Sequence, residues 1–419
     1  MTGKLAMFGG TRTVTLDEAD RKLLAWPIVT DAERTAILDV LEHGGFTSVG
    51  AGAAVVRELE ARWAAYTGTR HCAAVSNGTT AIELAIAAAG LDPGAEIVVP
   101  ALSFIATATA PLRHRIKPVF ADIDPRKFTL APAAAETAIT PRTQAILAVH
   151  LHGLPCDMTE LRALADRHGL RLVEDAAQAH GATYRGRQAG ALGDIAAFSL
   201  NVSKNLPTCG EGGLVTTDDA DMHDQVVLRR QFGERVPDKG ERPYVSEVVA
   251  GNAKLSSMQA AFTRCQLDRL AEWVAERERN VSGLLAGLAD LPGLVLPWTP
   301  PDRTHAWHML RFRFDVAAMG MPDVAPGAAR SLLQRALRAE GVPLQRYQSM
   351  PLPAQPALRA GKYDPREHPV TAAVLDDSLT LQRWHLNPAS EPVLRRCVEA
   401  FHKVWANLDV LAPVARQAS

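Results

Sequence analysis

The sequence predicts an α/β protein, with a large domain built on a mostly parallel sheet and a smaller C-terminal α+β domain. Two patterns lead to this prediction. Between about residues 35 and 275, short apolar runs alternate with amphipathic helical stretches, which is typical of βαβ units with right-handed crossovers. A Pro- and Gly-rich segment at 291–301 then interrupts the alternation. The chain of 419 residues is long enough for two or three domains.

The elements follow from these patterns in chain order. Hydrophobic periodicity predicts helices over residues 31–41 (capped by Thr30 or Asp31), 53–66, 79–89, 104–112 and 158–168. Apolar runs predict strands over 71–75, 96–99, 117–121, 145–150, 170–174, 196–200 and 213–217. One long helix is expected over 256–283, then a strand over 308–315 and helices over 328–340 and 391–411. We expect an N-terminal arm and large domain over 1–275 and a small domain over 276–419.

Composition excludes several classes of function. Lys and Arg number 45 against 46 Asp and Glu, so no basic excess favours a nucleic-acid partner. No window holds the roughly 18 apolar residues of a membrane span, and the start lacks a signal peptide. The five cysteines are odd in number and form no CxxC pair, which argues against a metal site or a disulfide framework. A cytoplasmic protein is the expectation.

Two charged residues follow predicted strands at positions where they can do chemistry. Asp175 ends an apolar strand, and a buried carboxylate needs a cationic partner such as a protonated pyridine nitrogen; the alternative is a helix N-cap. Lys204 follows the next strand, in a turn that leads to Gly210-Glu211-Gly212-Gly213. Lysine amines bind carbonyl cofactors covalently, pyridoxal phosphate above all; the alternative is a solvated surface lysine.

Two further segments suit a phosphate and a flat ring. Gly78 and Thr79 lie between a strand and a helix N-terminus, where backbone N–H groups bind anions, although Gly-Thr can also be a simple cap. Phe104 begins a helix after a strand, so it can stack on a cofactor ring or belong to the core.

These four segments, in this order, resemble the DegT/DnrJ/EryC1/StrS family of sugar aminotransferases, which are fold-type-I enzymes dependent on pyridoxal phosphate. The resemblance is strong from about Trp26 to Leu270 and looser to about Asp409. The segments around Trp26-Pro27 and His305–His308 are most similar to the branch of scyllo-inosose aminotransferases and amino-hydroxybenzoate synthases.

The resemblance implies a role for each matching residue. Lys204 would bind the cofactor covalently and move the proton, and Asp175 would pair with the pyridinium nitrogen. Gln178 would hydrogen-bond near the phenolic oxygen and Phe104 would stack on the ring. The phosphate would be held by Gly78, Thr79 and Ser199.

The segment Gly251-Asn252-Ala253-Lys254 resembles a family block whose Asn reaches the phosphate of the neighbouring subunit. The resemblance therefore implies a homodimer with shared active sites and assigns Asn252 to the cofactor. The block departs from the family at Ala253, where an aromatic residue is usual, and at the basic position, which is Lys254.

The reaction implied is transfer of an amino group from L-glutamine or L-glutamate to a keto sugar or keto cyclitol, in secondary-metabolite, aminoglycoside-like biosynthesis. A dehydratase or aromatase of the amino-hydroxybenzoate type is the alternative, since aromatising enzymes also keep the lysine. For His150 and His152 we favour packing or turn roles, and we expect Glu211 to brace its loop.

Overall fold

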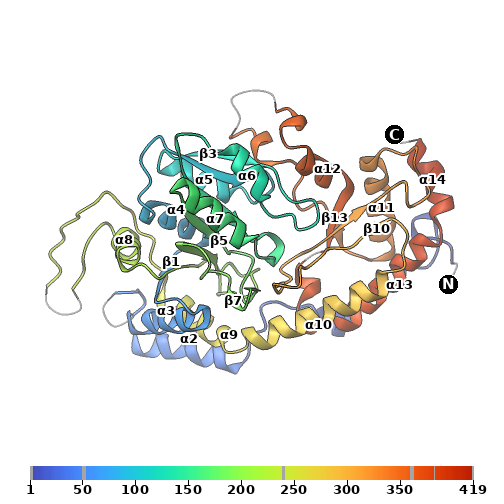
Figure 1. The fold of residues 1–419 in the computed structure, drawn as a ribbon. Helices are drawn as coiled ribbons and strands as arrows, with labels where there is room; N and C mark the ends of the chain where they lie inside the picture. Colours follow the sequence, from blue (N-terminus) through green and yellow to red (C-terminus); the bar gives the residue numbers. More distant parts are fainter. Residues whose placement is uncertain (1–2, 50–52, 238–240, 359–362, 382, 418–419) are drawn as a thin grey trace.

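The computed structural model describes residues 3–49, 53–237, 241–358, 363–381 and 383–417. Seven strands form one sheet (Figure 1). In spatial order they are β1 (His71–Val75), β9 (Gly213–Thr217), β8 (Ile195–Ser199), β5 (Arg171–Asp175), β4 (Thr143–Val149), β2 (Glu96–Pro100) and β3 (Lys117–Ala121).

The large sheet is mostly parallel, as predicted. Only β9 runs antiparallel to its neighbours, β1 and β8. In the parallel part, Val149 pairs with Asp175 and Asp175 pairs with Ala197. The carboxyl ends of β4, β5 and β8 therefore meet at one edge, which is where ligands of such sheets bind.

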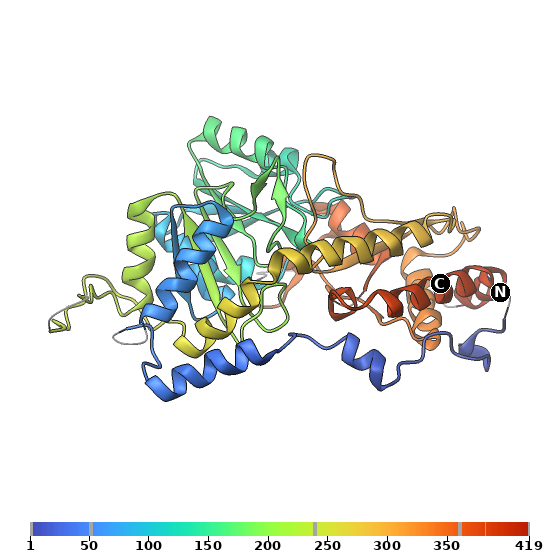
Figure 2. The ribbon, with the colours of Figure 1, turned by 90° about the horizontal axis from the view of Figure 1, so that it is seen from below.

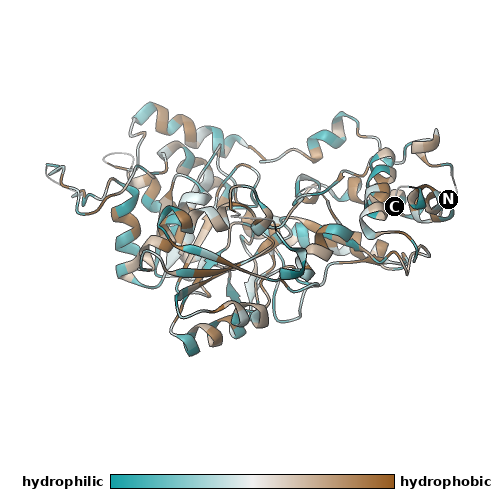
Figure 3. Ribbon diagram, turned by 90° about the horizontal axis from the view of Figure 1, so that it is seen from above, coloured by the Kyte–Doolittle hydropathy of each residue, from teal (hydrophilic) through white to brown (hydrophobic). Residues whose placement is uncertain are grey.

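Helices cover both faces of this sheet, because alternate residues of each strand point to opposite sides. On β1, Ala73 and Val75 face α4, α5 and α8, whereas Cys72 and Ala74 face α3 and α9. Brown apolar and teal polar residues alternate along the helices (Figure 3). The helices are α1 (Glu18–Leu23), α2 (Asp31–His43), α3 (Ala53–Thr67), α4 (Gly78–Ala88), α5 (Ala106–Arg113), α6 (Pro132–Ala138), α7 (Met158–His168), α8 (Ala220–Arg230), α9 (Ser257–Leu267) and α10 (Leu270–Leu288).

A second, antiparallel sheet organises the C-terminal part. Its strands, in spatial order, are β10 (Leu294–Val295), β11 (Leu310–Phe314), β13 (Ser378–Leu381) and β12 (Leu344–Gln345). The helices around it are α11 (Pro326–Glu340), α12 (Pro369–Asp377), α13 (Glu391–Trp405) and α14 (Leu408–Arg416). Leu5 and Val14 of the N-terminal arm pack into the same core, so both termini lie at this end of the molecule (Figure 1).

Two predicted helices are in fact pairs of helices. The segment 256–283 divides into α9 and α10 around Asp268 and Arg269, since α9 packs on α2 and α3 whereas α10 packs on α13. The segment 391–411 divides into α13 and α14, because Asn407 leaves the helical conformation with φ −123° and ψ 23°.

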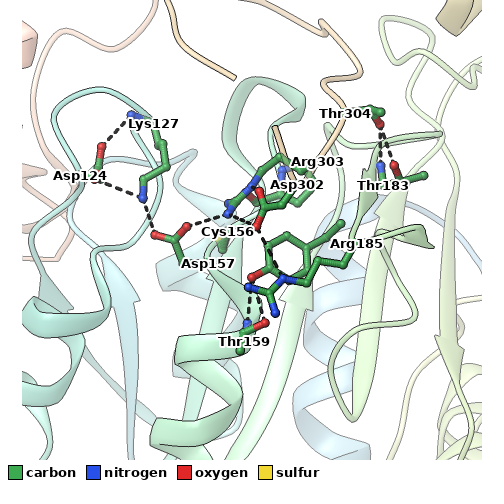
Figure 4. Close-up of polar contacts among 12 residues, drawn as sticks. Asp124, Lys127, Cys156, Asp157, Thr159, Thr183, Arg185, Asp302, Arg303 and Thr304 are labelled. Carbon is green, nitrogen blue, oxygen red and sulfur yellow. Dashed lines mark hydrogen bonds and ion pairs between the residues drawn. The ribbon is translucent and has the colours of Figure 1, made fainter. Parts of the chain in front are cut away.

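The division after residue 275 remains a proposal. The seven-stranded sheet lies before it and the four-stranded sheet after it, and α10 runs along both parts (Figure 2). Polar contacts join the two parts at residues 302–304 (Figure 4). There Arg303 forms an ion pair of 2.9 Å with Asp157, and Thr304 Oγ1 accepts a hydrogen bond from Thr183 N. Among the described helices, none has the length and apolar character to cross a membrane.

Candidate active site

A cavity of about 520 Å³ opens at the carboxyl edge of the large sheet. Of the residues predicted for the site, the lining includes Gly78, Thr79, Phe104, Asp175, Gln178, Ser199 and Lys204. They meet because Asp175 ends β5, Ser199 ends β8, and Gly78 begins α4 directly after β1. Asn252 is exposed and lies outside this lining, in a bridge with Gln231.

The N-terminus of α4 forms an anion cradle in the cavity wall. Asn77 caps the helix by accepting a hydrogen bond from Thr80 N at 2.9 Å, and the N–H groups of the first turn, at Gly78 and Thr79, have no partner within the helix. A Cβ on Gly78 would lie 2.5 Å from the Cβ of Ser199. Only glycine therefore lets this positive helix end approach the Ser199 hydroxyl, and the pair fits a phosphate.

Asp175 presents a buried carboxylate to the cavity. It is 6% exposed, and burial raises its pKa, although the hydrogen bond from Ala177 N and the charge of Lys204 oppose that shift. Thr107 Oγ1 donates to Oδ2 and Ala177 N donates to Oδ1, both at 3.2 Å. A charged carboxylate in such surroundings is stabilised by a cation, and a protonated pyridine nitrogen meets that need.

Lys204 lies beside Asp175 in the cavity lining, and the pKa of its amine is close to physiological pH. Burial lowers the pKa of Lys204 to about 8, while the charge of Asp175 acts in the opposite direction. The backbone of the lysine is held at both ends: its N–H donates to Asn201 O at 2.8 Å, and Trp26 Nε1 donates to its carbonyl oxygen at 3.0 Å. A lysine whose pKa is near the working pH can act as a nucleophile.

Gln178 and Phe104 complete the surroundings of a flat ring. The backbone N–H of His152 donates to Gln178 Oε1 at 2.6 Å, so the side-chain NH2 of Gln178 is left as a donor. The Gln178 side chain also forms a hydrogen bond with the Tyr347 hydroxyl. Phe104 precedes α5 and is 55% exposed, so its ring face is free for stacking rather than part of the core. Together with the cradle, Asp175 and Lys204, these side chains fit pyridoxal phosphate.

His150 has a packing role beneath Asp175, as the favoured interpretation predicted. Cys156 N donates to its Nδ1 at 3.1 Å, so Nε2 carries the proton and donates to Glu174 Oε2 at 2.8 Å. Glu174 also accepts from the backbone N–H groups of residues 190, 192 and 193. His152 has the turn role, with φ of 62°.

The predicted bracing role of Glu211 agrees with the structure, since its Oε1 accepts a hydrogen bond from Asn201 Nδ2 at 2.6 Å. Sequence reasoning missed other lining residues, notably Asn77, Tyr347 and Arg383. Asn77 precedes Gly78 and had an N-cap signal. Tyr347 lies in a loop of the C-terminal part and Arg383 begins a short 3-10 helix, Arg383–Leu386, and no local pattern marks them.

Comparison with known proteins places this geometry in a family. The DegT/DnrJ/EryC1/StrS aminotransferase family matches residues 27–393. The dTDP-3-amino-3,4,6-trideoxy-alpha-D-glucose transaminase of Streptomyces venezuelae is 40% identical over 307 residues, 73% of this chain and 76% of the relative. The L-glutamine:2-deoxy-scyllo-inosose aminotransferase of Streptoalloteichus tenebrarius is 36% identical over 395 residues, 90% of this chain and 89% of the relative.

A solved structure of 3-amino-5-hydroxybenzoic acid (AHBA) synthase aligns with a TM-score of 0.80 and 31% identity, covering 90% of this chain and 98% of that chain. The architecture of a large, mostly parallel sheet and a smaller domain is therefore that of fold-type-I enzymes dependent on pyridoxal phosphate. From the match over most of its length and the site that it encloses, the chain belongs to the DegT/DnrJ/EryC1/StrS aminotransferase family.

Proposed function

We propose that this aminotransferase moves an amino group from L-glutamine or L-glutamate to a keto sugar or keto cyclitol in secondary-metabolite, aminoglycoside-like biosynthesis. The observation that carries the proposal is the meeting of Lys204, Asp175 and the α4 cradle in one cavity. The names of two relatives, a deoxysugar transaminase and a glutamine:inosose aminotransferase, support this range of acceptors and glutamine as one donor.

Each lining residue has a task in this proposal. Pyridoxal phosphate, when bound, supplies the electron sink that makes the proton on the donor Cα acidic. Lys204 would bind the cofactor, and its neutral amine, once the donor's amino group had replaced it there, would move that proton. Asp175 would hold a proton at the pyridine nitrogen, and Gln178 would donate to the phenolic oxygen.

Orientation of the cofactor falls to the remaining residues. Gly78, Thr79 and Ser199 bind the phosphate, and Phe104 stacks on the ring. Asn252 would reach the phosphate of a second subunit, a role that its exposure and its absence from the lining of this cavity support. The protein is then a cytoplasmic homodimer with two shared active sites.

Dehydration or aromatisation is the second candidate function, because AHBA synthase shares the fold over 90% of this chain. Lys204 is compatible with both reactions. Amino transfer leaves the hydroxyl groups of the ring substrate in place, whereas dehydration or aromatisation removes hydroxyl groups.

The first test is the visible spectrum of the holoenzyme with L-glutamine and then L-glutamate. We expect a yellow band that one donor bleaches, with release of the 2-oxo acid. A band that neither donor bleaches would contradict transamination from these donors and favour the second candidate. Absence of the band after addition of pyridoxal phosphate would overturn the role of Lys204.

Two variants test the assigned roles. We expect Lys204→Ala and Asp175→Asn each to lower turnover by at least about 10³-fold, because one removes the nucleophile and the other the partner of the ring nitrogen. Steady-state rates of 2-oxo acid release measure this, and wild-type-like turnover in either variant would refute that residue's role.

A further inference from the structure

A second chamber lies on the other side of the lysine turn. It has a volume of about 280 Å³, and we call it the arginine chamber. Its lining includes Leu24, Trp26, Ser203, Arg277, Arg383 and Trp384. Ser203 and Arg383 also line the active-site cavity, so the two spaces share a wall directly beside Lys204.

Arg277 lines this chamber with a largely buried guanidinium. The residue is 3% exposed, and its Nε and Nη1 atoms have no hydrogen-bond partner among the described residues. Its guanidinium carbon lies 4.9 Å from the Trp26 ring centroid. Burial lowers the pKa of Arg277 to about 9, which shows how poorly the chain alone stabilises this charge.

Two other buried arginines are paired with carboxylates, and a third, Arg311, donates to Ser378 Oγ and Gln348 Oε1. Arg303 lies between Asp157 and Asp302, and Arg230 pairs with Glu60. A buried guanidinium without an acceptor costs free energy that a paired one recovers. Among the described residues Arg277 has neither a carboxylate of this kind nor an acceptor for its Nε and Nη1, so an anion from outside the chain would stabilise it.

Arg383 adds a second positive charge to the same space. Its Nε is also buried and without a hydrogen-bond partner in the described part of the chain. Its charge helps to lower the pKa of Lys204. The described lining of the chamber contains no Asp or Glu. Two guanidinium groups beside two indole rings form a flat, positive site that matches a carboxylate in shape and charge.

We propose that the arginine chamber binds a carboxylate group of a substrate between Arg277 and Arg383. The inference rests on the proposed aminotransferase function and adds to it the chemical group that the enzyme holds beside Lys204. The carboxylate can belong to the amino-acid donor or to a ring acceptor that carries an acid group. Trp26 stacks on Arg277 and donates a hydrogen bond to the backbone carbonyl of Lys204, so the chamber borders the backbone of the reacting lysine.

The test measures binding of two carboxylates and their uncharged amides to the holoenzyme by calorimetry. The donor probe is α-methyl-L-glutamate, whose Cα carries no proton to remove, and the ring probe is cyclohexanecarboxylate. The variants are Arg277→Gln and Arg383→Gln. Arg279→Gln is the matched control, because this arginine lies on the same helix with a side chain 63% exposed.

We expect the two chamber variants to weaken carboxylate binding by about 10- to 100-fold, with the amides unaffected and the control like wild type. Weakening for the donor probe alone assigns the carboxylate to the donor, and weakening for the ring probe alone assigns it to the acceptor. Weakening for both assigns the chamber to each substrate in turn. Unchanged affinity for both probes in both variants would overturn the proposal.

Stability measurements keep these outcomes interpretable. Arg277→Gln removes an unpaired buried charge, so its melting temperature should be no lower than that of wild type; if it does not fold, Arg383→Gln, at a partly exposed position, carries the test. Failure of wild type to transaminate any donor would overturn the proposed function and leave the carboxylate comparison standing. Normal transamination with unchanged binding in the variants would overturn the chamber alone.

Discussion

Lys204 and Asp175 set each other's ionisation. Burial favours the neutral form of each, lowering the pKa of the lysine to about 8 and raising that of the acid, while their opposite charges act against both shifts. The amine is therefore partly neutral at physiological pH without losing its charged neighbour. This balance is what a residue that must act as both nucleophile and proton carrier requires.

The pH dependence of cofactor binding to the apoprotein should show the pKa of the Lys204 amine. Because only the neutral amine reacts, the rate of yellow colour formation with pyridoxal phosphate should rise with pH around a midpoint near 8. Asp175→Asn removes the charge that raises the lysine pKa, so its midpoint should lie at lower pH. Stopped-flow absorbance gives both midpoints.

A surface-lysine variant controls for non-specific reaction, and Lys22→Ala is suitable because that side chain is 75% exposed. A wild-type midpoint near 10.5, the ordinary lysine value, would contradict the structural assignment of this pKa.

Sequence patterns could locate Asp175, Lys204 and the Gly78 turn because they lie at or after the ends of strands whose carboxyl ends share an edge, whereas Ser199 is assigned through the family resemblance. Tyr347 and Arg383 could not be located in this way. Tyr347 comes from a loop and Arg383 from a four-residue 3-10 helix of the C-terminal part, and their approach to the cavity depends on tertiary packing that leaves no periodic pattern in the sequence.

Among the secondary-structure elements, β2 depends on one buried acid at its first residue. Glu96 is 1% exposed and accepts hydrogen bonds from Lys117 of β3 at 3.2 Å and from Thr140 and Arg142 before β4, both at 2.5 Å. Burial alone would raise the pKa of Glu96, but these three donors lower it to about 2. One carboxylate thus joins the starts of three neighbouring strands.

We expect Glu96→Gln to lower the free energy of unfolding by about 1–3 kcal/mol at pH 7. Since the folded pKa lies below the ordinary value of 4.5, the advantage of the wild type is complete above that pH and declines as the pH falls towards 2. Urea unfolding at pH 7 and pH 3 measures the decline. Glu18→Gln, an 83% exposed position, is the control, and an equal difference at both pH values would refute this account.

Elements with strong periodicity could be predicted from the sequence, including the seven strands of the large sheet. The short strands β10, β12 and β13 could not, because two to four residues carry too little alternation. The break between α9 and α10 also escaped detection, since the apolar pattern continues through it and only the packing partners change.

At the scale of the whole molecule, the position of Asn252 allows a test of shared active sites. If Asn252 serves the neighbouring subunit, then Asn252→Ala and Lys204→Ala chains are each impaired alone but complement each other in a mixed dimer. One of the two sites then has an intact lysine and an intact asparagine. Random exchange of equal amounts should restore about a quarter of wild-type activity per chain.

Native mass spectrometry verifies subunit exchange in the same sample. Mixed dimers without any recovered 2-oxo acid release would place Asn252 in its own subunit's site and would contradict the shared arrangement.

The order of the lining residues along the chain has a consequence for synthesis on the ribosome. The cradle, Asp175 and Lys204 all lie before the end of β9 at Thr217, whereas Tyr347 and Arg383 follow much later. The half of the cavity that suits the cofactor is therefore synthesised well before the half contributed by the C-terminal part. A nascent chain that captures its cofactor early would meet its first substrate only after release.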